Sequence, residues 1–94
     1  ISMPSRFYNI LASGRPVIAI VDYDMEVASI IKKENIGWVV SPGDHSALAE
    51  AILEAQKDKS LIKKGQKSRI LAEEYYSYKR ILLLYKEALN NIHA

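Results

Sequence analysis

The sequence predicts an α/β fold with a short parallel sheet, helices on both faces of the sheet and a helical tail. The apolar, β-branched run over 16–21 opens with Pro16 and is typical of a strand buried on both faces. A second apolar run over 37–40 ends at a Ser-Pro-Gly turn, which predicts a second strand. The residues between the runs have helical periodicity. A crossover helix makes the two strands parallel and their connection right-handed.

Three helices are predicted around these strands. The first covers 5–13 and ends at Gly14, a residue that often follows the last helical turn. The second is the crossover helix over 25–35. The third runs from about 44 to 57, with Asp44 as its N-cap. Apolar residues recur at helical spacing in each, for example at Phe7, Ile10 and Leu11 in the first helix.

The tail is predicted to contain two further helices. One spans 60–75, and the other begins at Ser77, which is expected to cap it, and runs to about residue 92. Gly65 lies inside the first of these helices, where glycine costs roughly 1 kcal/mol relative to alanine. We therefore expect another segment of backbone to pack closely against Gly65.

The 94 residues allow one domain at most, which we divide into an α/β part over 1–57 and C-terminal helices over 58–94. Residues 1–56 carry a net charge of −3 and residues 57–94 a net charge of +5, so the tail is the basic part. Because two strands alone form a marginal sheet, we expect self-association. The sequence opens on Ile1, and we expect it to be a piece of a longer chain.

Composition excludes several classes of function. The absence of cysteine excludes disulfides and cysteine-based catalysis or metal binding. The motifs Gly-x-Ser-x-Gly, Gly-x-Gly-x-x-Gly and the phosphate-binding lysine loop are absent. His45 follows a capping residue and His93 lies near the end of the sequence, so neither indicates a catalytic site. The acids Asp22, Asp24 and Glu26 lack the glycine of a calcium loop and are interpreted as a solvated turn. We expect no catalytic residue, metal or cofactor in the chain.

The start of the first helix is the best candidate for ligand binding. Unpaired backbone N–H groups, the Ser5 hydroxyl and the Arg6 guanidinium suit an anion such as a diphosphate. Asn9 lies one turn further along, within reach of a sugar hydroxyl. The alternative interpretation is that Ser5 only caps the helix and Arg6 is a solvated charge.

The segment over 3–19 resembles the donor-binding segment of glycosyltransferases of the GT-B fold, in the large group 1 family (glycosyltransferase family 4). It is most similar to the bacterial branch that builds surface polysaccharides such as colanic acid. The matching residues of this segment are Pro4, Ser5, Tyr8, Asn9, Leu11, Ala12, Gly14, Arg15, Pro16, Val17, Ile18 and Ala19. Weaker matches follow in order at Glu26-Val27, Gly37, Val40, Pro42-Gly43-Asp44, Leu48 to Ile52, Gly65, Arg69, Ala72 and Tyr76-Ser77.

The resemblance implies that the chain is the last part of a Rossmann-like C-terminal domain. The intact enzyme would transfer a sugar from a nucleoside diphosphate donor to a saccharide or lipid-linked acceptor, without a metal. Ser5 and Arg6 would then bind the donor diphosphate, Tyr8 the adjoining sugar-phosphate pocket and Asn9 the ribose. Many family members carry two glutamates, whose positions correspond to Ile1 and Asn9 here, and neither of these residues is acidic. The lysine of the bacterial branch corresponds to Arg6.

The resemblance also implies an N-terminal acceptor domain outside these residues and a cytoplasmic location, with peripheral contact at the inner face of the membrane. Nucleic acid is not an expected partner, and the isolated 94 residues are expected to be inactive. The alternative function is a non-catalytic α/β assembly module. Trp38 is interpreted as a core residue, with stacking on a ligand as the alternative. Packing roles are predicted for Tyr75, Tyr76, Tyr78 and Tyr85. The charges at Lys63, Lys64, Lys67 and Arg69 are interpreted as a solvated helix face.

Overall fold

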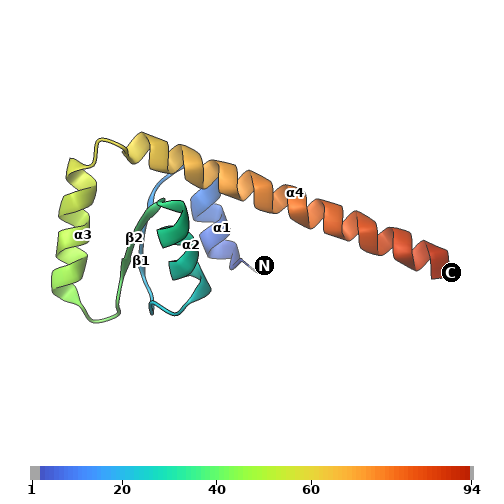
Figure 1. Cartoon of the computed structure of the whole chain (residues 1–94), viewed down its shortest axis with the longest axis horizontal. Coiled ribbons are helices and arrows are strands. Elements are labelled where there is room, and N and C mark those ends of the chain that lie inside the picture. Colours follow the sequence, from blue (N-terminus) through green and yellow to red (C-terminus); the bar gives the residue numbers. More distant parts are fainter. Residues whose placement is uncertain (1–2, 94) are drawn as a thin grey trace.

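The computed structural model describes residues 3–93 and confirms the predicted α/β class (Figure 1). The elements follow one another as α1 (Ser5–Ala12), β1 (Val17–Ile20), α2 (Glu26–Glu34), β2 (Gly37–Val40), α3 (His45–Lys57) and α4 (Leu61–His93). The first five elements form a small body. The sixth, α4, crosses this body and projects far beyond it, which gives the molecule a longest dimension of 58 Å.

The two strands form a parallel sheet in the predicted arrangement. Val17 lies opposite Gly37 and Ile20 opposite Val40. The ladder continues at both ends, where the Val17 amide donates to the Ile36 carbonyl at 3.1 Å and the Val21 amide donates to the Val40 carbonyl at 3.0 Å. The prediction that a crossover helix joins parallel strands is confirmed.

Helices cover both faces of this sheet. Figure 1 shows α3 on one side and α1 with α2 on the other. The main core lies on the side of α1 and α2, where α4 also contributes. Its buried members are Phe7, Leu11, Val17, Ile31, Ile36 and Ala72. Burying such side chains contributes roughly 1.5–3 kcal/mol each, so this cluster is the main source of stability in a small body.

Most predicted helix ends are confirmed because they depend on local chemistry. α1 ends at Ala12, and Gly14 then adopts a left-handed φ of 74°. The Asp44 carboxylate caps α3 by accepting a hydrogen bond from the Ala47 amide at 3.0 Å. α2 ends at Asn35, which is also left-handed, with a φ of 53°. Glycine and asparagine are the residues that tolerate this conformation best.

The prediction of two tail helices is wrong, because α4 is one helix of 33 residues. Ser77 does not cap a second helix but lies within α4. A serine inside a helix costs only about 0.5 kcal/mol, and no glycine or proline accompanies it to end the helix. The apolar stripe of α4 also runs through this position without a phase change, at Tyr75, Tyr78 and Leu82. One continuous helix keeps that stripe on a single face.

The predicted close packing at Gly65 is confirmed. Gly65 is buried where α4 crosses the turn between α1 and β1, and a Cβ atom placed on it would overlap the carbonyl oxygen of Gly14. The backbones of the two segments therefore meet without intervening side chains. This contact brings Ser68 and Ala72 of the same helix face into the interior, where both are fully or almost fully buried.

Gly65→Ala is expected to destabilise the protein by about 1–3 kcal/mol, although alanine is the better helix former. The added methyl group must push α4 away from the Gly14 turn. Urea denaturation monitored by circular dichroism measures the effect. Gln66→Ala is the matched control on the exposed face of the same helix, and we expect it to leave the free energy of unfolding nearly unchanged. Equal stability of the two variants would contradict a tight contact at Gly65.

Candidate functional site

The amino end of α1 provides backbone donors that have no acceptor among the described residues. Pro4 occupies the N-cap position and makes no side-chain capping bond. The first helical hydrogen bond runs from the Tyr8 amide to the Pro4 carbonyl at 3.0 Å. Within residues 3–93, the amides of Ser5, Arg6 and Phe7 therefore have no backbone acceptor. Ser5 is the first helical residue, and Pro4 holds the capping position that the alternative interpretation gave to Ser5.

Three of the four predicted site residues share one face of α1. Ser5, Arg6 and Asn9, together with Ile10 and Ser13, line an open depression of about 440 Å³. All five side chains are exposed. Within residues 3–93, no carboxylate forms an ion pair with Arg6, and the first turn of α1 contains no acidic residue. The helix dipole and the guanidinium thus both contribute positive potential at this depression.

Tyr8, the fourth predicted site residue, lies on a different face of α1. It is half-buried against the core and its ring packs against that of Tyr75, with centroids 5.9 Å apart. The Tyr75 hydroxyl accepts a hydrogen bond from the Met3 amide at 3.2 Å. Tyr8 is therefore not among the residues that line the depression, and its contact with a donor stays a prediction. Ile1, the position of the first family glutamate, lies outside the described residues.

The depression is oriented toward the carboxyl ends of the strands. α1 enters β1 through the turn at Gly14, so α1 runs back along the sheet and its amino end points toward the carboxyl edge. Ligands of open α/β sheets bind at that edge. Asp22, Asp24 and Glu26 are exposed at or just after the β1 end, as predicted for a solvated turn. The described residues contain no cluster of metal-ligating side chains.

Neither histidine lies among the residues that line this depression. His45 is the exposed first residue of α3, and the side chain of His93 is outside the description. The candidate site is therefore built from one short helix, and its binding of an anion stays a prediction. It supplies hydrogen-bond donors and a cation, with no general base or nucleophile beside them.

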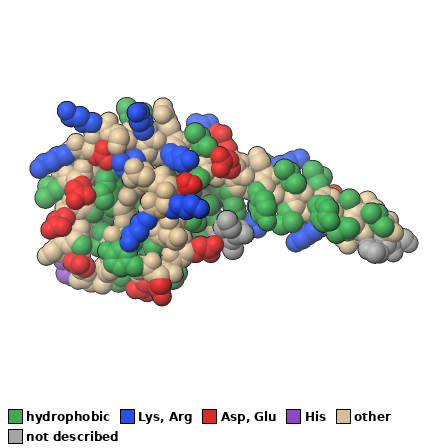
Figure 2. Space-filling model, viewed as in Figure 1, with side chains coloured by type: hydrophobic (Ala, Val, Ile, Leu, Met, Phe, Trp, Pro, Cys, Tyr) green, Lys and Arg blue, Asp and Glu red, His purple; other side chains and the backbone are tan. Residues whose placement is uncertain are grey.

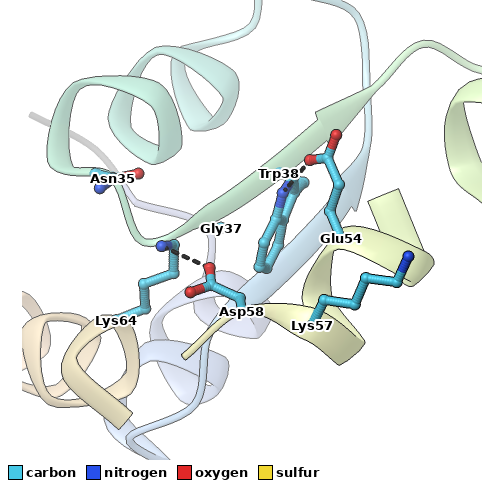
Figure 3. A pocket seen from close by; sticks show the side chains of 7 residues that line it. All are labelled: Asn35, Gly37, Trp38, Glu54, Lys57, Asp58 and Lys64. Atoms are coloured by element: carbon cyan, nitrogen blue, oxygen red, sulfur yellow. Dashed lines mark hydrogen bonds and ion pairs between the residues drawn. The ribbon is translucent and has the colours of Figure 1, made fainter. Parts of the chain in front are cut away.

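A second depression, of about 330 Å³, surrounds Trp38 at the opposite edge of the sheet (Figure 3). Trp38 is only half-buried, so its interpretation as a core residue is wrong. Strand alternation places its ring on the face covered by α3, where the indole Nε1 donates to Glu54 Oε2 at 3.0 Å. Lys64 Nζ lies 5.6 Å from the centroid of the same ring. Sequence reasoning missed this cluster because its members are far apart in the chain.

Asp58 connects this groove to the start of α4. Its carboxylate pairs with Lys64 Nζ at 2.8 Å and accepts hydrogen bonds from the Ser60 amide and hydroxyl at 2.7 and 2.6 Å. These partners, Lys64 first, lower the pKa of Asp58 from its ordinary 3.8 to about 2. The indole, carboxylates and ammonium in the groove therefore satisfy one another. We interpret the groove as a joint between β2, α3 and α4.

The remaining charged and aromatic residues of α4 divide along its length. The solvated-face interpretation is wrong for Lys64, whose side chain is 12% exposed, whereas Lys63, Lys67 and Arg69 are exposed. Lys67 lies 3.9 Å from Glu34 and Arg69 pairs with Glu73 at 3.2 Å.

Of the four tyrosines predicted to pack, only Tyr75 does so. Tyr76, Tyr78 and Tyr85 are 51–62% exposed.

Asp58→Asn is expected to be less stable than the unmodified chain near neutral pH, and the difference should vanish in acid. Because folding lowers this pKa, the stabilisation is complete above 3.8 and is lost as the pH falls toward about 2. Urea denaturation of both proteins across this range measures the difference in unfolding free energy. Lys64→Met, which removes the partner, should show the same convergence. A difference that stays constant down to the lowest pH would refute the assignment.

Comparison with known proteins points to one class of enzyme. The chain is 32% identical over 79 residues to the probable glycosyltransferase WbjE of Pseudomonas aeruginosa, an alignment that covers 83% of this chain and 20% of that protein. The chain thus spans about a fifth of the length of this relative. No family model and no solved structure matches the chain. Among the helices of residues 3–93, none combines the length and hydrophobicity needed to cross a membrane. The chain therefore has a distant, partial similarity to a probable glycosyltransferase.

Proposed function

We propose that this chain is part of the donor-binding domain of a glycosyltransferase. The intact enzyme would transfer a sugar from a nucleoside diphosphate to a saccharide or lipid-linked acceptor in bacterial polysaccharide biosynthesis. The observation that carries the proposal is the 32% identity with a probable glycosyltransferase over 79 residues. The resemblance of residues 3–19 to group 1 glycosyltransferases of the GT-B fold supports it independently of the structure.

The geometry of α1 supports a specific role in this reaction. Ser5, Arg6 and the free amides of the first turn would hold the donor diphosphate, and Asn9 would contact the ribose. Negative charge develops on the diphosphate as the sugar leaves. A helix start and a guanidinium that are already in place stabilise that charge without reorganisation. The site needs no metal for this task.

The proposal assigns the acceptor to another part of the enzyme. The depression at α1 is an open surface, whereas group transfer requires donor and acceptor to be held together in a closed cleft. The second wall would come from an N-terminal acceptor domain outside these 94 residues. A lipid-linked acceptor would place the enzyme in the cytoplasm, at the inner face of the membrane. The isolated chain is accordingly proposed to bind donor weakly and to transfer no sugar.

Titration with uridine diphosphate and guanosine diphosphate, followed by amide NMR, tests the site. We expect shifts concentrated at the amides that follow Pro4, up to Asn9, with a dissociation constant of about a millimolar because few contacts remain. Arg6→Ala should abolish these shifts by removing the one cation among the described residues that line the depression. Asn9→Asp should weaken them less, because the carboxylate still accepts from the ribose while it repels the phosphates.

The matched control is Arg80→Ala, which removes an exposed arginine from the projecting part of α4. This variant should bind the nucleotides as the unmodified chain does. Shifts confined to Lys63, Lys64 and Lys67 would indicate nonspecific anion binding and would favour the assembly-module alternative. Sugar transfer by the 94 residues alone would contradict the proposed second domain.

A further inference from the structure

Tyr75 of α4 contacts the chain on both sides of the candidate anion site. Its hydroxyl accepts a hydrogen bond at 3.2 Å from the amide of Met3, which comes just before the first turn of α1. Its ring packs against that of Tyr8, which comes just after this turn, with centroids 5.9 Å apart. The amides that lack acceptors among the described residues lie between these two contacts. One side chain from a distant helix therefore contacts both ends of the segment that carries the donors.

Matched lengths of the two helices bring Tyr75 to this position. α4 contacts α1 at both ends, because Gly65 lies at the Gly14 turn that follows α1 and Tyr75 lies at the start of α1. The interval 65–75 on α4 and the interval 4–14 across α1 have the same number of residues. Both are almost entirely helical, so each spans about 15 Å. The tight backbone contact at Gly65 thus fixes one end of α1, and Tyr75 meets the other.

Tyr75 lies on an anchored stretch of α4. It is half-buried, and Lys79 Nζ, one turn further along, lies 5.6 Å from the centroid of its ring. Ala72, one turn earlier, is almost fully buried in the core. After Tyr75, every described side chain of α4 except Leu82 is exposed, and the molecule narrows to this single helix (Figure 2). Tyr75 therefore lies where α4 leaves the body, next to the start of α1.

The first turn of α1 needs support from outside the helix. α1 has eight residues, and its N-cap residue Pro4 makes no side-chain capping bond. Helices of this length are marginal in isolation, and their ends are the first parts to open. Backbone amides bind an anion well only when they already point in one direction. If the first turn had to be ordered by the ligand, that ordering would reduce the affinity.

We propose that Tyr75 is a positioning residue for the candidate donor site. It is not among the residues that line the depression on α1. It acts through Met3 and Tyr8, by keeping the first turn of α1 helical before the ligand arrives. In this assignment Tyr8 supports the site from the core side of the helix. The inference rests on the proposed function for the identity of the ligand, a nucleoside diphosphate.

Amide exchange in the chain without nucleotide tests the contact itself. Tyr75→Phe removes the hydroxyl and keeps the ring that packs on Tyr8. Hydrogen exchange of the Met3 amide should become about fivefold faster, the equivalent of one net hydrogen bond. Tyr76→Phe is the matched control, because it removes the same hydroxyl from the adjacent side chain, which is 53% exposed. This control should leave exchange at Met3 unchanged.

Titration with uridine diphosphate and guanosine diphosphate, followed at the first-turn amides, tests the role in binding. The initial slope of such a titration is inversely proportional to the dissociation constant, so weak binding can be compared between variants. Tyr75→Phe should lower the slope about threefold, and Tyr75→Leu about tenfold because it also removes the ring contact. Tyr76→Phe should bind as the unmodified chain does. If Tyr75→Leu does not fold, Tyr75→Phe decides alone.

The outcomes separate this inference from the proposed function. Urea denaturation of the same variants identifies a merely structural role, which would lower the free energy of unfolding and leave the slope unchanged. Unchanged binding by Tyr75→Phe, with or without faster exchange at Met3, would overturn the inference and leave the proposed function intact. Failure of the unmodified chain to bind either nucleotide would refute the donor site and with it the binding role of Tyr75.

Discussion

The contact between Gly65 and Gly14 determines how the rest of the chain is arranged. It lets the backbone of α4 rest on the turn between α1 and β1, which sets the path of the longest helix across the body. α1 has only eight residues, too few to be stable as an isolated helix. Its position therefore depends on α4, whose Ala72 joins Phe7 and Leu11 in the core. The candidate anion site at Ser5 and Arg6 is held in place by a helix that begins more than fifty residues later.

The two depressions on the body differ in how their polar groups are satisfied. Around Trp38, the indole, Glu54, Lys64 and Asp58 bond to one another, and the cluster joins three elements. At the start of α1, the donors have no such partners within the described residues. The groove around Trp38 is thus not the better candidate for a ligand. The α1 start is the better candidate for binding because its amide donors lack partners among the described residues, whereas the polar groups around Trp38 bond to one another.

Sequence predicted those features that are encoded within a few residues. The strands, the Asp44 cap, the Gly14 stop and the unusual glycine at position 65 each depend on local chemistry, and all are confirmed. The anion site was placed on Ser5, Arg6 and Asn9 because they follow one another on a short helix, and these three do share a face. Whether they bind a donor stays a prediction.

The features that sequence missed depend on contacts between distant segments. Trp38 reads as a core residue in isolation, yet it is only half-buried and its indole donates to the exposed Glu54 on α3. Tyr8 lies only two residues after Arg6, yet it faces Tyr75, because two residues along an α-helix point about 200° apart. The sequence analysis predicted a helix boundary at Ser77 from a single serine, whereas α4 continues through this residue.

The position of the single tryptophan gives the protein an intrinsic optical reporter. Indole emission shifts in wavelength and intensity with exposure to water and with the charges beside the ring. Trp38 is half-buried, hydrogen-bonded to α3 through Glu54 and close to the Lys64 ammonium of α4. Its fluorescence therefore records the corner where these two helices meet the sheet. Separation of either helix from β2 changes the emission without any label attached to the chain.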